Sequence, residues 1–154
     1  MDEAIFKEIA NEIKGLNNQA IKLISQGKLD EAETLCQKAL DTTRTFSYYD
    51  GMAMCYFNLA NLEAIRDDLL KAMAYGVLCG EMHEKAQTDM ERHCKLMGNL
   101  AMAAMKKGMG FEREGKLKEA LEYYFASLPF VEEKYSQAIT KEIELIERVL
   151  NNGQ

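Results

Sequence analysis

Apolar residues recur at helical spacing along nearly the whole chain. Near the N-terminus they stand three or four positions apart from Ile5 to Leu23, so they share one face of a helix. The same pattern predicts further helices over residues 29–43, 48–66, 69–81, 84–113 and 117–127. Asp2 is placed to cap the first helix, and Pro129 suits the first turn of a seventh. Because continuous β-branched runs are nearly absent, we expect an all-α fold.

Two short segments are almost identical. Residues 27–32 read GKLDEA and residues 115–120 read GKLKEA, while residues 67–72, DDLLKA, are a weaker copy that lacks the glycine. A glycine can adopt the left-handed conformation that ends one helix and turns the chain. An acidic residue near the next N-terminus interacts favourably with the helix dipole. Each copy therefore predicts a tight turn between two helices, with the alanine allowing them to approach closely.

Small residues flank the three alanines at matching distances. Twelve residues before them and seven residues after them stand Ala20, Ala60, Gly108, Ala39, Cys79 and Ser127. Apolar residues fill the helical positions between them. This arrangement predicts paired antiparallel helices that cross at small residues.

On these residues the chain resembles the tetratricopeptide repeat family, in the long-helix variety of kinesin light chains and bacterial regulatory scaffolds. The resemblance covers residues 13–129 and departs from the family at Glu63, where an aromatic residue is usual. It implies a superhelix of about three antiparallel helix pairs plus a C-terminal capping helix. The expected single domain, residues 1–154, has repeat units at about 2–45, 46–82 and 84–128 and a capping helix at 129–151.

The resemblance also implies a concave surface lined by the first helix of each pair. By position, the partner-binding groove would contain Asn17, Ile21, Ile24, Met54, Phe57, Asn61, Met102, Met105 and Met109. Methionine side chains adapt to varied apolar ligands, so we expect a peptide or helix of a partner protein there. The alternative, that the C-terminal helix covers the methionines as ordinary core, stays open. The carboxylate clamp of one tetratricopeptide subfamily is mostly missing, since Ile21 and Met102 replace two of its polar residues.

Charge and composition narrow the class of partner. With a net charge of −6 the chain disfavours nucleic acid, and no apolar run is long enough for a membrane span. The N-terminus lacks the pattern of a signal peptide. Scattered cysteines in apolar helical contexts (Cys36, Cys55, Cys79 and Cys94) predict buried free thiols in a cytoplasmic protein.

Metal binding and catalysis find little support. Cys79, His83, His93 and Cys94 are the one group with metal-ligand chemistry, but adjacent helical residues point about 100° apart. No nucleophile motif or phosphate-binding glycine loop is present. We therefore expect no metal, no cofactor and no enzymatic activity.

The sequence thus predicts a non-catalytic protein–protein interaction scaffold. Two alternatives remain open: a secretion-type chaperone of the same build that holds an apolar client segment, and a structural protein that self-associates, for example as a homodimer.

Overall fold

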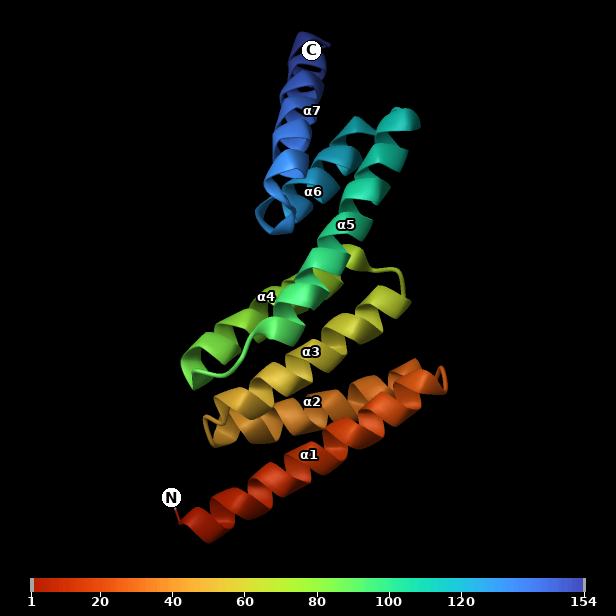
Figure 1. Ribbon diagram of the computed structural model, residues 1–154. Helices are drawn as coiled ribbons and strands as arrows, with labels where there is room; N and C mark the ends of the chain where they lie inside the picture. The colour runs from red at the N-terminus through yellow and green to blue at the C-terminus, as the bar shows by residue number, and fades with distance from the viewer. Residues whose placement is uncertain (1, 154) are drawn as a thin grey trace. The chain divides into compact units, whose positions relative to one another are not determined.

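The computed structural model describes residues 2–153, which form seven α-helices and one 3-10 turn (Figure 1). The helices are α1 (Glu3–Ser25), α2 (Leu29–Thr45), α3 (Tyr49–Ile65), α4 (Leu69–Ala86), α5 (Glu91–Arg113), α6 (Leu117–Ser127) and α7 (Glu133–Asn152), with the turn η1 at Leu128–Phe130. No strand occurs within that range, so the predicted all-α fold is confirmed. The Asp2 cap is confirmed too, because its Oδ1 accepts a hydrogen bond from the Ala4 N–H at 3.0 Å.

The chain divides into two compact units, Met1–His93 and Cys94–Gln154, and each has its own apolar core. In the first unit, α1 to α4 pack as successive antiparallel neighbours (Figure 1). The core between them includes Ile13, Cys36, Leu40, Cys55, Leu59 and Cys79. In the second unit the core includes Met105, Ala120, Tyr124, Ile139, Ile143 and Ile146.

Five helices end in the same way, with one residue at positive φ. These residues are Gly27, Ser47, Asp67, Gln87 and Gly115. The residue after each donates its N–H to a carbonyl five positions back, as Lys28 does to Leu23 at 2.9 Å and Lys116 to Phe111 at 2.9 Å. This is the Schellman arrangement, which satisfies carbonyls left over at a helix end. The predicted turn at residues 67–72 therefore forms without a glycine.

Helix boundaries differ from the expected ones in two places. Helix α4 continues to Ala86 and α5 begins only at Glu91, because Gln87 takes the left-handed conformation and the Asp89 carboxylate accepts from the Glu91 N–H at 3.0 Å. Pro129 was expected in the first turn of the last helix, which is wrong. It lies in η1, and Val131 is extended, so α7 starts at Glu133.

The small residues lie where helices approach closely. All six predicted flanking positions, and Ala32, Ala72 and Ala120, are buried. A Cβ added to Gly108 would lie 3.0 Å from the Tyr124 ring, which shows how near α5 and α6 come. The small residues are thus buried in both units, and the close approach of two helices at one of them is confirmed for α5 and α6.

Glu63, the departure from the family pattern, is buried and ion-paired. Its Oε1 lies 2.9 Å from Arg66 and 3.6 Å from Lys71. Arg66 also contacts Glu33 at 2.7 Å and Asp30 at 2.6 Å, so one guanidinium ties α2 to the end of α3. A buried carboxylate is tolerated only with such partners.

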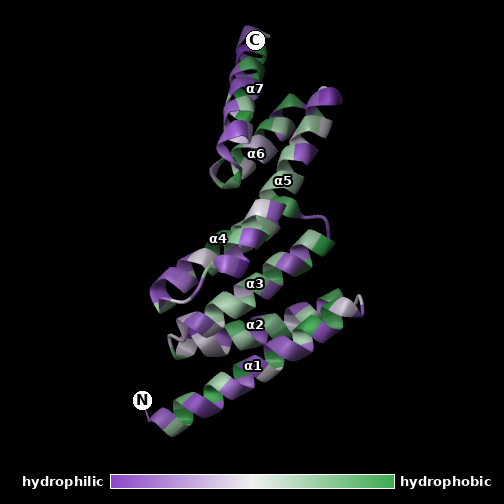
Figure 2. Cartoon of the chain, viewed as in Figure 1, coloured by the Kyte–Doolittle hydropathy of each residue, from purple (hydrophilic) through white to green (hydrophobic). Residues whose placement is uncertain are grey.

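Polar and apolar residues are interleaved along α1 and α7, as expected for helices with one buried face (Figure 2). No helix within residues 2–153 is both long and apolar enough to cross a lipid bilayer.

The turn glycines generate a test with a matched control. Gly27 has φ +75° and open space around its Cα, so Gly27→Ala would meet no atoms, and its cost comes from the backbone alone. We expect a loss of about 1 kcal/mol in the free energy of unfolding. Gly15 is helical and also has open space, so Gly15→Ala should instead gain about 0.5–1 kcal/mol. Urea denaturation followed by circular dichroism measures both changes in the free energy of unfolding. If the two substitutions changed it in the same direction, the turn assigned at Gly27 would be contradicted.

Candidate partner-binding site

The first unit contains a small hollow of about 170 Å³, lined by α1, α3, His83 of α4, Asp89 and Arg92 at the start of α5. We call it the first-unit hollow. Ile21, Met54 and Phe57 form its apolar wall, and Asn17 and Asn58 also line it. It thus combines large apolar side chains with buried amides.

The two amides are bonded to each other. The Asn58 Nδ2 donates to the Asn17 Oδ1 at 2.9 Å, and the Asn17 Nδ2 donates to the Ile13 carbonyl at 3.1 Å. Asn17 is 1% exposed and Asn58 is 6% exposed. Buried amides need such partners, and this pair links α1 to α3 beneath the hollow.

His83 and Arg92 also line the first-unit hollow. The Arg92 guanidinium lies over the Phe57 ring, 4.8 Å from its centroid, in the geometry of a cation–π contact. His83 Nδ1 lies 2.7 Å from the Thr88 hydroxyl, and burial lowers the pKa of its imidazole. His83 therefore contributes a neutral ring near neutral pH.

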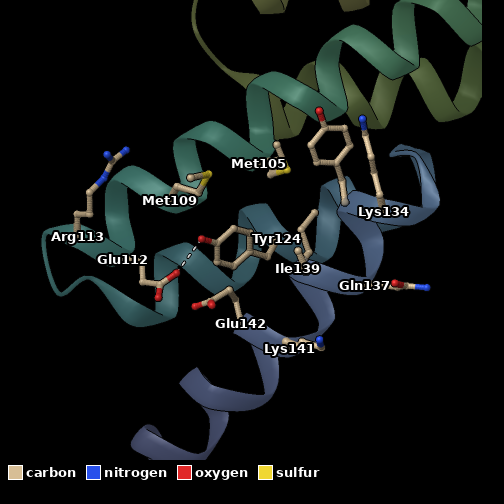
Figure 3. A pocket seen from close by; sticks show the side chains of 12 residues that line it. Met105, Met109, Glu112, Arg113, Tyr124, Lys134, Gln137, Ile139, Lys141 and Glu142 are labelled. Atoms are coloured by element: carbon tan, nitrogen blue, oxygen red, sulfur yellow. Dashed lines mark hydrogen bonds between the residues drawn. The ribbon is translucent and has the colours of Figure 1, made fainter.

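The second unit contains a larger cavity of about 710 Å³ between α5 and α7, with Tyr124 of α6 at its base (Figure 3). We call it the second-unit cavity. Met105 and Met109 line it from α5, and Tyr135 and Ile139 line it from α7. Met105 is buried, whereas Met109 is 44% exposed. The wall is therefore largely apolar, and one flexible methionine is available to a ligand.

Two carboxyl groups meet at one end of this cavity. The Tyr124 hydroxyl donates to the Glu112 Oε1 at 2.7 Å, and Glu142 lies beside them (Figure 3). A hydrogen bond with Glu112, together with burial and the negative charge of Glu112, raises the pKa of the Glu142 carboxyl. Burial and the bond to Glu112 likewise raise the pKa of Tyr124, so its hydroxyl stays protonated. Glu112 and Glu142 thus form an acidic pair, and the neutral Tyr124 hydroxyl holds Glu112 in position by a hydrogen bond.

The expected groove residues fall into three groups. Asn17, Ile21, Met54 and Phe57 line the first-unit hollow, and Met105 and Met109 line the second-unit cavity. Ile24 and Asn61 are half-buried and line neither; the Asn61 amide donates to the Phe57 carbonyl of its own helix at 3.1 Å. Met102 is half-buried against the second-unit core. Their role in binding a partner stays a prediction.

Several lining residues were not anticipated. In the second unit they come chiefly from α7, including Tyr135, Ile139 and Glu142. Tyr135 and Ile139 belong to an apolar stripe of the sequence that predicts only a capping helix, and Glu142 lies outside that stripe. Helix α7 therefore contributes one wall of the second-unit cavity.

The cysteines and histidines do not assemble into a metal site. Cys36, Cys55 and Cys79 are buried free thiols, but Cys94 is exposed, which corrects the expectation that all four are buried. His93 Nε2 lies 2.7 Å from the Gly76 carbonyl, and its Nδ1 is buried without a hydrogen-bond partner. Among residues 2–153, no three His, Cys, Asp or Glu side chains converge in a way that would hold a metal ion.

Comparison with solved structures finds a partial similarity. The chain is similar to the type III secretion translocator chaperone SycD of Yersinia enterocolitica, with 15% identity, a TM-score of 0.46, and coverage of 94% of this chain and 88% of that one. No protein-family model and no curated protein matches the sequence.

The thiols generate a chemical test. Burial raises the pKa of Cys36 to about 12, that of Cys55 to about 11 and that of Cys79 to about 12, so these thiols stay protonated and shielded. We expect iodoacetamide to label only Cys94 in the native protein and all four after denaturation, as counted by mass spectrometry. Cys94→Ser should abolish native labelling. Rapid native labelling of this variant would contradict the burial of the other three.

The asparagine pair generates a second test. Asn58→Ala removes the donor to the buried Asn17 oxygen and should cost about 1–3 kcal/mol in the free energy of unfolding. Asn17→Ala should cost a similar amount. Because the two share one bond, the double variant should lose less than the sum, with a coupling of about 0.5–3 kcal/mol. Strict additivity in urea denaturation would show that the pair contributes no coupling.

Proposed function

We propose that this chain is a non-catalytic protein-interaction module of the tetratricopeptide type, which binds an apolar segment of a partner protein. The observation that carries the proposal is the second-unit cavity, where the partly exposed Met109 faces an open space of about 710 Å³. Isolated apolar side chains on a surface are ordinary, but a concave apolar wall marks a binding site. Methionine suits such a wall because its side chain is flexible and polarisable.

The tetratricopeptide assignment is supported by the chain's own geometry. Helices alternate in direction in the first unit, and left-handed residues end them at positions 27, 47, 67 and 87. Small residues lie at the crossings, as the family pattern requires. Helical repeats of this kind use their concave faces to bind other proteins.

The size of the cavity limits what enters it. A volume of about 710 Å³ is typical of pockets for drug-sized ligands, which span about 300–1,000 Å³. It therefore accommodates a few side chains of a partner segment rather than a whole helix. The first-unit hollow, at about 170 Å³, offers room for a single side chain beside Ile21 and Met54.

A chaperone that holds an apolar client segment would use the same surface and is one form of the proposed function. The proposal includes a cytoplasmic location, on the strength of the free thiols and the acidic composition.

Met109→Glu tests the proposal. Short peptides are selected from a random displayed library on the immobilised full chain, and their affinities are measured by fluorescence anisotropy. Selected peptides should be rich in large apolar residues and should bind Met109→Glu at least about tenfold more weakly, because a carboxylate replaces an apolar contact. Met105 is unsuitable for this test because it is only 8% exposed and belongs to the core.

Val149→Glu is the matched control. Val149 is 58% exposed on α7 and lies outside the cavity, so this variant adds the same charge and should leave affinity unchanged. Equal affinity of the peptides for wild type and Met109→Glu would refute binding in the cavity. The oligomeric state of the chain without peptide is measured in parallel by sedimentation. If the chain self-associates and Met109→Glu disrupts this association, the cavity binds a second copy of the chain rather than a different protein.

A further inference from the structure

We propose that the partner segment presents one lysine or arginine side chain to Glu112 and Glu142, next to the apolar side chain that contacts Met109. This inference rests on the proposed function and specifies the chemistry of its partner. The second-unit cavity is an apolar groove with a localised acidic end, and the occupant is chosen by charge complementarity with that end.

The acidic end is built from three helices. Glu112 comes from α5, Glu142 from α7 and Tyr124 from α6, and the three side chains point toward one another (Figure 3). The Tyr124 hydroxyl, 2.7 Å from Glu112, fixes one carboxylate in place. Met109 lies one helical turn before Glu112 on α5, so an apolar contact and an acidic contact are adjacent.

Two neighbouring carboxyl groups repel each other when both are ionised, so a proton or another positive charge between them is favoured. The raised pKa of Glu142 reflects this arrangement. A guanidinium or ammonium group supplies the same neutralisation with a full positive charge and several N–H donors. A basic side chain therefore gains binding free energy at this position by neutralising the two carboxyl groups, whereas a neutral or acidic side chain does not.

The chain's own basic residues do not fill this position. Within residues 2–153, neither Glu112 nor Glu142 has a Lys or Arg in salt-bridge range among the ion pairs of the structure. Lys134 contacts Glu132 at 3.9 Å and lies over the Tyr135 ring. The acidic pair is thus available to a ligand.

Basic residues around the cavity narrow the choice of partner. Arg113, Lys134 and Lys141 line it away from the two carboxyl groups, as Figure 3 shows. A strongly basic segment would be repelled by these three residues. The favoured segment therefore carries a single basic residue beside large apolar ones, rather than a run of basic residues.

The experiment uses the peptides selected on the full wild-type chain. The single basic residue of a selected peptide is replaced by glutamine, and its affinity is compared on wild type, Glu142→Gln and Glu142→Lys. On wild type the replacement should weaken binding at least about tenfold. The ratio of the two affinities is the preference for the basic residue. Glu142→Gln should reduce this preference to less than about threefold, and Glu142→Lys should remove it, because the introduced ammonium group pairs with Glu112.

Glu147→Gln is the matched control, because Glu147 is exposed on the same helix and does not line the cavity. It removes the same charge and should preserve the preference. Thermal unfolding by circular dichroism confirms that each variant is folded.

Two other results are distinguishable. If the peptides depend on Met109 but bind equally well with glutamine in place of the basic residue, the acidic end does not select a cation; this inference is overturned and the proposed function survives. If no selected peptide is weakened by Met109→Glu, both fall.

Discussion

Five times in this chain, a residue at positive φ ends a helix and sends the backbone into the next one. The first four lie at positions 27, 47, 67 and 87, a constant interval of 20 residues, so one helix and one turn form the structural unit of the first half. Each turn satisfies carbonyls at a helix end by the same two hydrogen bonds. Helix length, the direction of the next helix and the register of the faces between them all follow from where these turns fall.

Close packing between the helices depends on that register. The turns recur evenly, and small residues such as Ala20 and Ala39 share the buried core with large neighbours such as Leu40 and Leu59. Two groups of buried polar side chains in this interior are partnered within the fold. Asn58 bonds to Asn17 and so links α3 to α1, while Arg66, which pairs with the buried Glu63 of its own helix, also reaches Glu33 of α2.

The sequence predicted the helical class, the Gly27 and Gly115 turns and the crossings, because glycine, alanine and apolar spacing report directly on backbone and packing. It concealed the 20-residue interval, since Ser47, Asp67 and Gln87 adopt the left-handed conformation without the residue type that normally signals it. The Glu112–Glu142 pair could not be predicted from the sequence either. Their contact joins positions 30 residues apart, and α7 had been assigned to a cap, so no local pattern brings them together.

The two units differ in the polar groups that lie beside the first-unit hollow and the second-unit cavity. In the first unit, the buried amides and Glu63 have partners within the fold, and the hollow above them is small. In the second unit, a cavity four times larger by volume retains an exposed methionine and two carboxyl groups that lack a basic partner among the described residues. Evolved sequences usually satisfy such groups internally, and departures concentrate at functional sites. In the proposed function, the end of α5 and the inner face of α7 bind the partner, because a ligand there would supply both the apolar contact and the positive charge that the fold does not provide.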